Sequence, residues 1–332
     1  MTSRLMKRVI RYEDVPLPYN MESMLNDILK NVFVLPSLAM GILGDPNAFY
    51  TADDGTSVPT NASHYGKKVC TCQGKCTCNR IFLDPSASWG WDSYREVYYY
   101  GHTYHLFTAC DSKYDLPIHI KCVSANRHDS ITGIFALHEL LLLYPQIRFH
   151  SAAFDSAYDN TPFYQLLNHY GIVPIIDLNP RRTSSEPSSD YVCYDDKGVL
   201  RTVKCGEKMR NWGIINNSFR RKFLFPVQCD NCDLCPINSS KTYYEKTIDN
   251  PHFSGTIVRG SQRWRMLYKR RTTTERANDR IKYDFKVKSA RCHSRNIRSV
   301  RTFCAAFCCY IDAWYNENPV QLADVFPLLA AA

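Results

Sequence analysis

The sequence predicts an α/β domain, and three observations lead to that prediction. Of its 332 residues, 45% are hydrophobic and 22% are charged, which is ordinary globular usage and argues against a disordered, collagen-like or coiled-coil chain. Strand-like segments come first and then alternate with helix-like ones, in the order β-β-β-α-β-α-β between residues 49 and 178. Helical periodicity returns after residue 263, beyond a stretch of different composition. We therefore expect one α/β core that an insertion interrupts.

The expected strands rest on β-forming residues and on the turns between them. Residues 49–56 (FYTADDGT) are predicted to form a strand that ends in a turn at Gly55. Residues 95–111 and 116–125 are rich in β-branched and aromatic side chains, and the short turn between them predicts an antiparallel pair. Two later strands are expected at residues 147–155 and 172–178.

The expected helices rest on apolar residues at helical spacing. They cover residues 21–34, 130–143, 161–171 and about 264–315. The longest apolar run, residues 131–143, is interrupted by His138 and Glu139 and is too short to span a bilayer. The first thirty residues lack the apolar core of a secretory signal. The sequence therefore predicts neither export nor a membrane partner.

These elements divide the chain into five parts. The segment between the two halves of the core is rich in Pro, Ser, Asn, Lys and Cys, which predicts short strands and loops. The parts are a short helical N-terminal remnant (1–45), the first part of the core (46–178), the insertion (179–262), the second part of the core (263–315) and a C-terminal tail (316–332).

The positive charge of the chain is concentrated in one region. The net charge is +9, but residues 201–301 carry 24 basic and 8 acidic side chains, whereas residues 1–200 carry 17 and 21. Such a block attracts a polyanion, because neutralising phosphates releases condensed counterions. A solvated basic face is the alternative when charge stands alone.

Three acids occupy positions from which they could converge. Asp54 lies near the end of the first strand, Asp155 ends the fourth, and Glu275 lies on the late basic helix. Carboxylates from separate elements can hold two divalent metal ions, which suits phosphoryl chemistry. A single strand-end Asp is more often a cap or turn residue, so spacing alone leaves both interpretations open.

The residues around these acids carry a resemblance to a known family. Residues 268–282, YKRRTTTERANDRIK, place Tyr268, Arg271, Glu275 and Lys282 in the spacing Tyr-x2-Arg-x3-Glu-x6-Lys. This segment resembles the signature around the catalytic glutamate of insertion-sequence transposases with a DDE active site, in the group like insertion sequences four, five and eleven-eighty-two. Further segments agree in the family's order from about residue 50 to 310: DDGTSVPTNASHYGK, DPSASWG, YYYGHTYHL, LPIHIKCVSANRHDS and AAFDSAYDN.

The resemblance implies a fold and a metal site. The fold is ribonuclease-H-like, a mixed sheet flanked by helices and interrupted here by a Cys-containing insertion. Asp54, Asp155 and Glu275 would be the catalytic residues and would bind two Mg²⁺ or Mn²⁺ ions. Asp53 competes for the first position, and Asp54 is preferred because the family's acid directly precedes the glycine of its DG(T/S) turn.

The resemblance also implies contacts with DNA. Arg271, Glu275 and Lys282 lie at i, i+4 and i+11, so on one continuous helix they would share roughly one face. Arg271, Arg276 and Lys282 would bind DNA, and Tyr268 would help to position the strand end. An exposed helix with Glu–Arg pairs is the alternative interpretation.

The implied activity is cleavage of a phosphodiester at the transposon ends, followed by attack of the freed 3′-OH on target DNA. The implied partners are double-stranded DNA and a second copy of the chain as a homodimer on DNA, and the implied location is the cytoplasm, at the nucleoid. Two alternatives remain: a catalytically inactive or truncated transposase-derived DNA-binding protein, and a zinc-stabilised module that binds RNA or protein. Relatives usually carry a helical domain before the first aspartate, whereas 53 residues precede Asp54, which favours a truncated copy.

The fifteen cysteines form two groups of interest, and without an export signal they predict thiols or metal ligands rather than disulfides. Cys229, Cys232 and Cys235 have the spacing C-x2-C-x2-C, and Cys205 or Cys193 could complete a structural Zn²⁺ site. Four more cysteines lie within nine residues, where a soft-metal site and a reactive surface loop are both open: Cys70, Cys72, Cys76 and Cys78.

Overall fold

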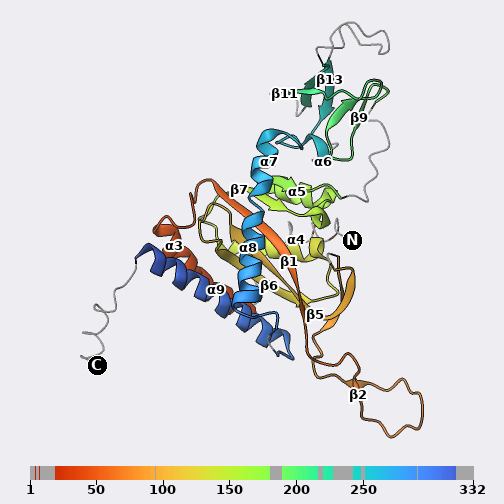
Figure 1. Cartoon of the computed structure of the whole chain (residues 1–332), viewed down its shortest axis with the longest axis vertical. Coiled ribbons are helices and arrows are strands. Elements are labelled where there is room, and N and C mark those ends of the chain that lie inside the picture. The colour runs from red at the N-terminus through yellow and green to blue at the C-terminus, as the bar shows by residue number, and fades with distance from the viewer. Residues whose placement is uncertain are drawn as a thin grey trace. The chain divides into compact units, whose positions relative to one another are not determined.

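Figure 1 shows the computed structural model of the chain. It describes Arg4, Lys7 and residues 19–93, 95–179, 189–215, 220–226, 242–247, 251–289 and 291–318. The chain folds as two compact units. One, here called the β1 unit, consists of Glu13–Arg148 and Thr272–Ala332, and the other, the β7 unit, consists of Met1–Tyr12 and Phe149–Arg271.

An antiparallel sheet forms the centre of the β1 unit. Residues 101–109 of its longest strand pair with residues 51–59. The other edge of this longest strand pairs with residues 88–92 and then with residues 117–124. The strands are β1 (Phe49–Pro59), β4 (Ser88–Asp92), β5 (Val97–Ala109) and β6 (Pro117–Ser124), with β5 as the longest. A separate hairpin of β2 (Lys67–Lys68) and β3 (Arg80–Ile81) lies between β1 and β4 in the chain.

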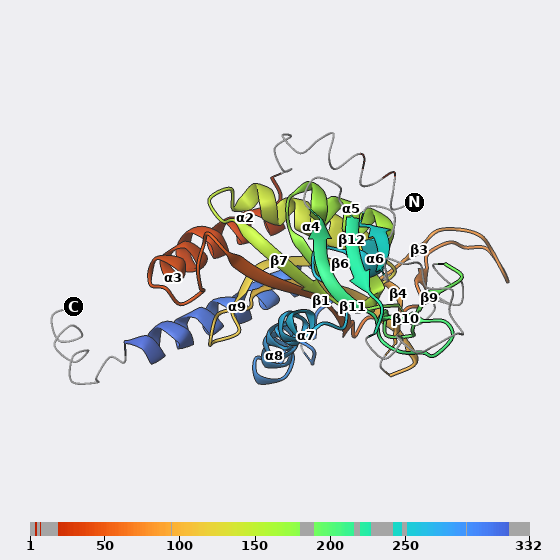
Figure 2. The same cartoon turned by 90° about the horizontal axis from the view of Figure 1, so that it is seen from above.

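Helices cover both faces of this sheet. Figure 2 shows α4 and α8 on opposite sides of β1 and β6. The long helix α9 packs against β6, where the Tyr310 hydroxyl donates a hydrogen bond to the Pro117 carbonyl at 2.9 Å. The helical segments are α2 (Met21–Ile28), a π-helix (Leu29–Val34), α3 (Leu35–Ala39), α4 (Asp129–Leu143), α8 (Thr272–Asp279), a second π-helix (Arg280–Asp284) and α9 (Arg295–Glu317).

Side chains of α2 form hydrogen bonds with backbone groups of β6 that, among the described residues, pair with no strand. The Asn26 amide accepts from the Ile120 N–H at 3.2 Å and donates to the Ile120 carbonyl at 3.0 Å. Glu22 accepts from the Cys122 N–H at 2.9 Å. Because an unpaired strand edge is a template for aggregation, this helix protects β6 as well as packing on it.

The β7 unit contains a parallel strand pair. Strands β7 (Phe149–Phe154) and β8 (Val173–Ile176) run in the same direction and are joined through α5 (Thr161–His169). A short 3-10 turn, Ser156–Tyr158, follows β7, and α7 (Gln262–Lys269) packs on both strands. Parallel strands require such a crossover connection.

The remaining part of the β7 unit forms small antiparallel sheets with a core of their own. The elements are β9 (Val192–Tyr194), β10 (Leu200–Thr202), β11 (Arg210–Ile215), β12 (Arg220–Leu224), β13 (Thr242–Lys246) and α6 (Pro251–Ser254). Buried side chains from four of these elements and from Met209 pack together, with the Tyr194 and Phe253 rings stacked at 4.2 Å. The predicted insertion is therefore built of short strands, as expected.

The predicted fold class is confirmed. The elements β1, β5, β6, α4, β7, α5 and β8 occur in the order read from the sequence, and the short strands β2, β3 and β4 lie between β1 and β5 in addition. Antiparallel and parallel strand pairs occur together with flanking helices. The division into five parts at the predicted boundaries stays a prediction. Among the described residues, no helix combines the length and the apolar character needed to cross a membrane.

Two local predictions were wrong. The first strand does not end at Gly55 but continues to Pro59, because β5 is long enough to pair with it throughout. Gly55 lies in a closely packed position: a Cβ there would lie 3.0 Å from the His105 ring and 3.1 Å from an Asp129 oxygen, so both side chains would have to shift. The late helix is also discontinuous, because α7 ends at Lys269 and α8 begins at Thr272.

A half-buried ion pair ties α4 to β6 and makes a prediction about acid stability. Glu139 accepts from Lys121 Nζ at 2.5 Å and lies 3.5 Å from His119 Nε2. Burial alone would raise the pKa of Glu139, but His119 and Lys121 outweigh it and lower the pKa from 4.5 to about 2. The carboxylate therefore stabilises the fold above the unfolded pKa, and this contribution is lost as the pH falls from 4.5 towards 2.

We expect Glu139→Gln to lower the free energy of unfolding at pH 7 by up to about 3 kcal/mol, the value of a shift of this size. Urea unfolding of both proteins at several pH values measures the difference, which should be constant down to about pH 5.5 and shrink below it. Glu317→Gln, at an exposed pair with Lys113, is the control and should change stability little. A difference independent of pH would contradict the assignment.

Candidate active site

Two neighbouring acids of β1 lie on opposite faces of the sheet, since successive side chains of a strand alternate. Asp53 is fully buried, and its Oδ2 lies 3.5 Å from His105 Nδ1. The other ring nitrogen of His105 lies 3.5 Å from Asp129 at the start of α4. Burial lowers the pKa of His105, but Asp53, Asp129 and Asp54 together outweigh burial and raise it. Asp53 thus belongs to a buried ionic cluster beneath α4.

Asp54 faces the helix that bears Glu275. Its Oδ2 accepts a hydrogen bond from Asn278 Nδ2 on α8 at 3.1 Å. Asn278 follows Glu275 by three residues, about one helical turn, so both lie on neighbouring positions of α8. A hydroxyl contact of 2.5 Å between Thr274 and Thr108 fixes the same helix on β5. The β1 unit therefore directs Asp54, and not Asp53, towards the Glu275 helix.

Glu275 lies in the first turn of α8 and is half-buried. Its neighbours Thr274 and Asn278 are buried at 0% and 1% exposure and hold α8 against the sheet. The predicted shared face of Arg271, Glu275 and Lys282 stays a prediction, although Glu275 and Lys282 do lie on one uninterrupted helical stretch. Arg271 lies in the turn between α7 and α8, and Lys282 lies in the π-helix that follows α8.

Two of the predicted DNA-binding cations have carboxylate partners within the β1 unit. Arg276 donates to both oxygens of Asp115, at 2.7 and 2.6 Å, and this pair raises its pKa although some burial opposes the shift. Lys282 Nζ lies 3.3 Å from Asp279. The Arg276 side chain is nevertheless 58% exposed, so its guanidinium remains accessible beside its partner.

Asp155 directly follows β7 in the β7 unit. Its Oδ1 accepts a hydrogen bond from the Ala157 N–H at 2.9 Å and so caps the 3-10 turn. Asp155 therefore does have the capping role that the sequence left open, and this role uses one oxygen of its half-buried carboxylate. The neighbouring network of Asp159, which is 2.6 Å from His252 Nδ1 and accepts from the Tyr164 hydroxyl, holds the segment after it in place.

A second acid lies beside Asp155 and was missed by the sequence analysis. Phe154 and Ile176 are register partners in the parallel pair, so Asp155 and Asp177 each follow one of two adjacent strand ends. The signal was present, because Asp177 is the last residue but one of the strand predicted at residues 172–178, and Asp155 ends the strand predicted at residues 147–155. Carboxyl ends of neighbouring parallel strands meet at one edge.

Tyr268 and Arg271 belong to the same unit as these two acids. The Tyr268 hydroxyl donates to Asp177 Oδ2 at 3.2 Å, and its ring stacks on Trp264 at 4.8 Å. The Arg271 guanidinium lies 5.7 Å above the Tyr268 ring. Burial and Asp177 raise the pKa of Tyr268 to about 12 against the opposing effect of Arg271, so the phenol stays protonated and can donate.

The predicted zinc ligands fall mostly outside the described residues, which is the case for Cys229, Cys232 and Cys235. Cys205 is exposed, and its Sγ lies 2.8 Å from the Thr202 hydroxyl. Cys193 is half-buried on β9. The predicted zinc site of the insertion therefore stays a prediction.

Comparison with known proteins gives the family. A family model described as a transposase DDE domain matches residues 51–311. No curated protein matches the chain. Among solved structures, a cryo-electron microscopy structure of a piggyBac transposase synaptic complex with hairpin DNA is similar, with 11% identity and a TM-score of 0.25 over 86% of this chain. The chain covers 57% of that transposase. Because the family model covers well over half of the chain, from the strand bearing Asp54 into α9, the chain belongs to the transposase DDE domain family.

Proposed function

We propose that the chain is an insertion-sequence transposase that cleaves phosphodiesters at transposon ends and transfers the freed strand to target DNA. The observation that supports this proposal most directly is the different fate of two adjacent acids. Asp53 is buried and lies 3.5 Å from His105, whereas Asp54 faces α8, which carries Glu275. A catalytic carboxylate must be held in position by its scaffold, and the Asn278 amide does this for Asp54.

The donor set fits divalent magnesium or manganese. Asp54, Asp155 and Glu275 supply carboxylate oxygens, the ligand type that these ions prefer. All three side chains are half-buried, and Asp54 and Asp155 are each oriented by a hydrogen bond from an amide, of Asn278 and of Ala157. Two such ions, when bound, lower the pKa of an attacking water and stabilise the leaving oxygen.

The protein's own contribution would be positioning. Tyr268 donates from a phenol that burial keeps protonated, and Arg271 lies over its ring. Such a pair can hold a phosphate beside the acids at the strand ends, since guanidinium and phosphate oxygens match in geometry. Holding the scissile phosphate in line supplies much of the catalysis in phosphoryl transfer.

The partners and location remain part of the proposal. Double-stranded DNA is the expected substrate, because the basic segment 201–301 attracts phosphates. A homodimer would present two active sites to the two ends of one element. Association with the nucleoid would follow from DNA binding. An inactive DNA-binding protein is the outcome if binding occurs without Mg²⁺-dependent cleavage.

We expect Asp54→Asn, Asp155→Asn and Glu275→Gln each to lower Mg²⁺-dependent cleavage of end-containing DNA by at least about 1,000-fold, as loss of a metal-binding carboxylate does in phosphoryl transfer. Nonspecific DNA binding should stay within a few-fold of wild type. Single-turnover cleavage of labelled end DNA measures the first effect and filter binding the second. Asp312→Asn on α9, whose acid pairs with Arg280, is the matched control. Full cleavage by any triad variant would remove that residue from the site.

The two neighbouring acids should separate stability from activity. Asp53→Asn breaks a buried pair with His105 and should destabilise the protein by about 3 kcal/mol while the folded fraction still cleaves DNA. Asp54→Asn keeps an oxygen for Asn278 and should change stability by less than about 1 kcal/mol while cleavage is lost. Urea unfolding and cleavage per folded molecule measure the two effects. The reverse pattern would make Asp53 the metal ligand.

The DNA-binding cations should differ in the salt dependence of binding. Arg271→Ala should reduce the slope of log K against log salt by about one, the value for one lost phosphate contact. Lys282→Ala should reduce the slope by less than one, because the Lys282 amine lies 3.3 Å from Asp279. Arg276→Ala should reduce it less, because Asp115 already neutralises this guanidinium. Lys113→Ala, outside the basic segment and paired with Glu317, is the control. Unchanged slopes for Arg271→Ala and Lys282→Ala would exclude them from the DNA interface.

A further inference from the structure

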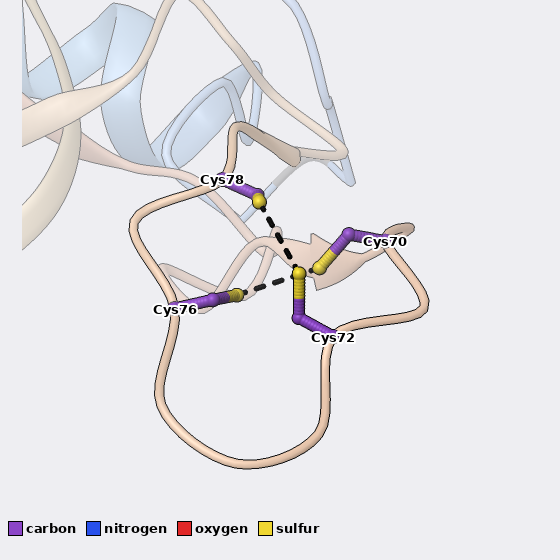
Figure 3. Close-up of side chains that lie close together, drawn as sticks. All are labelled: Cys70, Cys72, Cys76 and Cys78. Carbon is purple, nitrogen blue, oxygen red and sulfur yellow. Dashed lines mark hydrogen bonds between the residues drawn. The ribbon is translucent and has the colours of Figure 1, made fainter.

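The four cysteines of the β2–β3 hairpin lie together at one point. Their sulfur atoms are all within 4.8 Å of one another, and the described residues contain no other such group of three or more potential metal ligands. Figure 3 shows the side chains of Cys70, Cys72, Cys76 and Cys78 turned towards the interior of the loop. They converge although they lie in an exposed part of the β1 unit.

The distances between the sulfurs fit a tetrahedral metal site. Cys70 Sγ lies 3.4 Å from Cys76 Sγ, and Cys72 Sγ lies 3.7 Å from Cys78 Sγ. A zinc ion with Zn–S bonds of about 2.3 Å places its ligands about 3.8 Å apart. A disulfide requires about 2.05 Å, so these pairs are arranged as neighbouring thiols and not as bonded sulfurs.

The path of the loop backbone allows two C-x-C segments to supply four ligands to one metal ion. The two arms, which carry Cys70 with Cys72 and Cys76 with Cys78, have no helical turn. In an extended segment, residues i and i+2 point to the same side, so each arm can present two thiols to the other. Gly74 lies between the arms with φ +81°, a backbone conformation that lets the chain reverse.

Packing contributes little to the stability of the β2–β3 loop. The hairpin has two residue pairs, Lys67 with Ile81 and Lys68 with Arg80. Its apolar side chains are largely in solvent, with Val69 56% exposed and Ile81 62% exposed. A segment without a core gains its stability from a covalent or metal clip.

The charges of the loop match a tetrathiolate centre. Four thiolates around a divalent ion carry a net charge of −2, and residues 55–83 contain basic side chains but no Asp or Glu. Lys68 Nζ donates to the carbonyls of Cys72 and Gly74, which ties the first arm to the tip. Sulfur ligands without oxygen ligands select zinc and other soft ions over magnesium or calcium.

We propose that Cys70, Cys72, Cys76 and Cys78 bind one structural zinc ion that fixes the β2–β3 loop. Its four ligands include none of the residues of the predicted DDE triad or of the predicted zinc site of the insertion. It holds whether or not the chain cleaves DNA.

Metal content of the full-length chain, purified with a thiol reductant and without chelators, tests the proposal by elemental mass spectrometry. Cys72→Ser/Cys78→Ser should lose about one equivalent of zinc relative to wild type. Cys304→Ser/Cys308→Ser, which removes two exposed thiols of α9, should lose none. Cys229→Ser/Cys232→Ser measures any zinc that the insertion binds. Combining it with Cys72→Ser/Cys78→Ser should lower the zinc content by the sum of the two separate losses. Unchanged zinc in Cys72→Ser/Cys78→Ser, or iron in place of zinc, would overturn the proposal.

Limited proteolysis gives a second readout on the wild-type chain, which stays informative if a variant fails to fold. Trypsin can cut after Lys75, between the two arms. We expect removal of zinc with a chelator, under reducing conditions, to speed this cut at least 10-fold and added zinc to restore protection. Equal rates with and without zinc would overturn the proposal. The intact mass of the protein purified without reductant gives a further check. A wild-type mass lower by four hydrogens, which reductant restores and which Cys72→Ser/Cys78→Ser does not show, would indicate two disulfides in the loop. This result would also overturn the proposal.

Discussion

The alternation of side chains along β1 is the constraint on which the site depends. Adjacent residues of a strand must point to opposite faces, so Asp53 and Asp54 cannot share a role. Pairing with β5 fixes which face each one meets: Asp53 lies opposite Phe107 and contacts His105, while Asp54 lies opposite Leu106 and meets Asn278. A shift of one residue in this register would exchange the two acids. The register is secured by nine residue pairs between β1 and β5.

The two units anchor their acids by different means. In the β1 unit, a helix with buried Thr274 and Asn278 is locked on the sheet, and its half-buried Glu275 is carried with it. In the β7 unit, Asp155 is held by the turn that it caps, and the buried pair of Asp159 and His252 secures the next segment. The family signature crosses from one unit to the other, because the boundary falls between Arg271 and Thr272. The segment with the signature spacing therefore includes the link between the two compact units as well as α8.

The sequence predicted element type and order well, because these depend on local periodicity and turn residues. It predicted the end of β1 wrongly, because the length of a strand depends on a partner that is distant in the chain. Gly55 looked like a turn residue, yet it lies inside the strand, where His105 and Asp129 pack closely against it. The helix break at residues 270–271 also had no local signal, since neither Gly nor Pro occurs there. The convergence of four thiols depended on the path of the loop, which spacing alone could not decide.

The basic segment of the chain supplies less free positive charge than its composition indicates. Arg298 is 1% exposed and donates to the carbonyls of Val287 and Pro59, and Arg221 is 3% exposed and donates to those of Gly255 and Thr256. Burial lowers the pKa of both guanidinium groups, because it disfavours their charged form. Arg276 is paired with Asp115, an acid from outside the segment. Affinity for DNA must therefore come from the exposed remainder, so the position of each cation, and not the total of the segment, determines how phosphates are held.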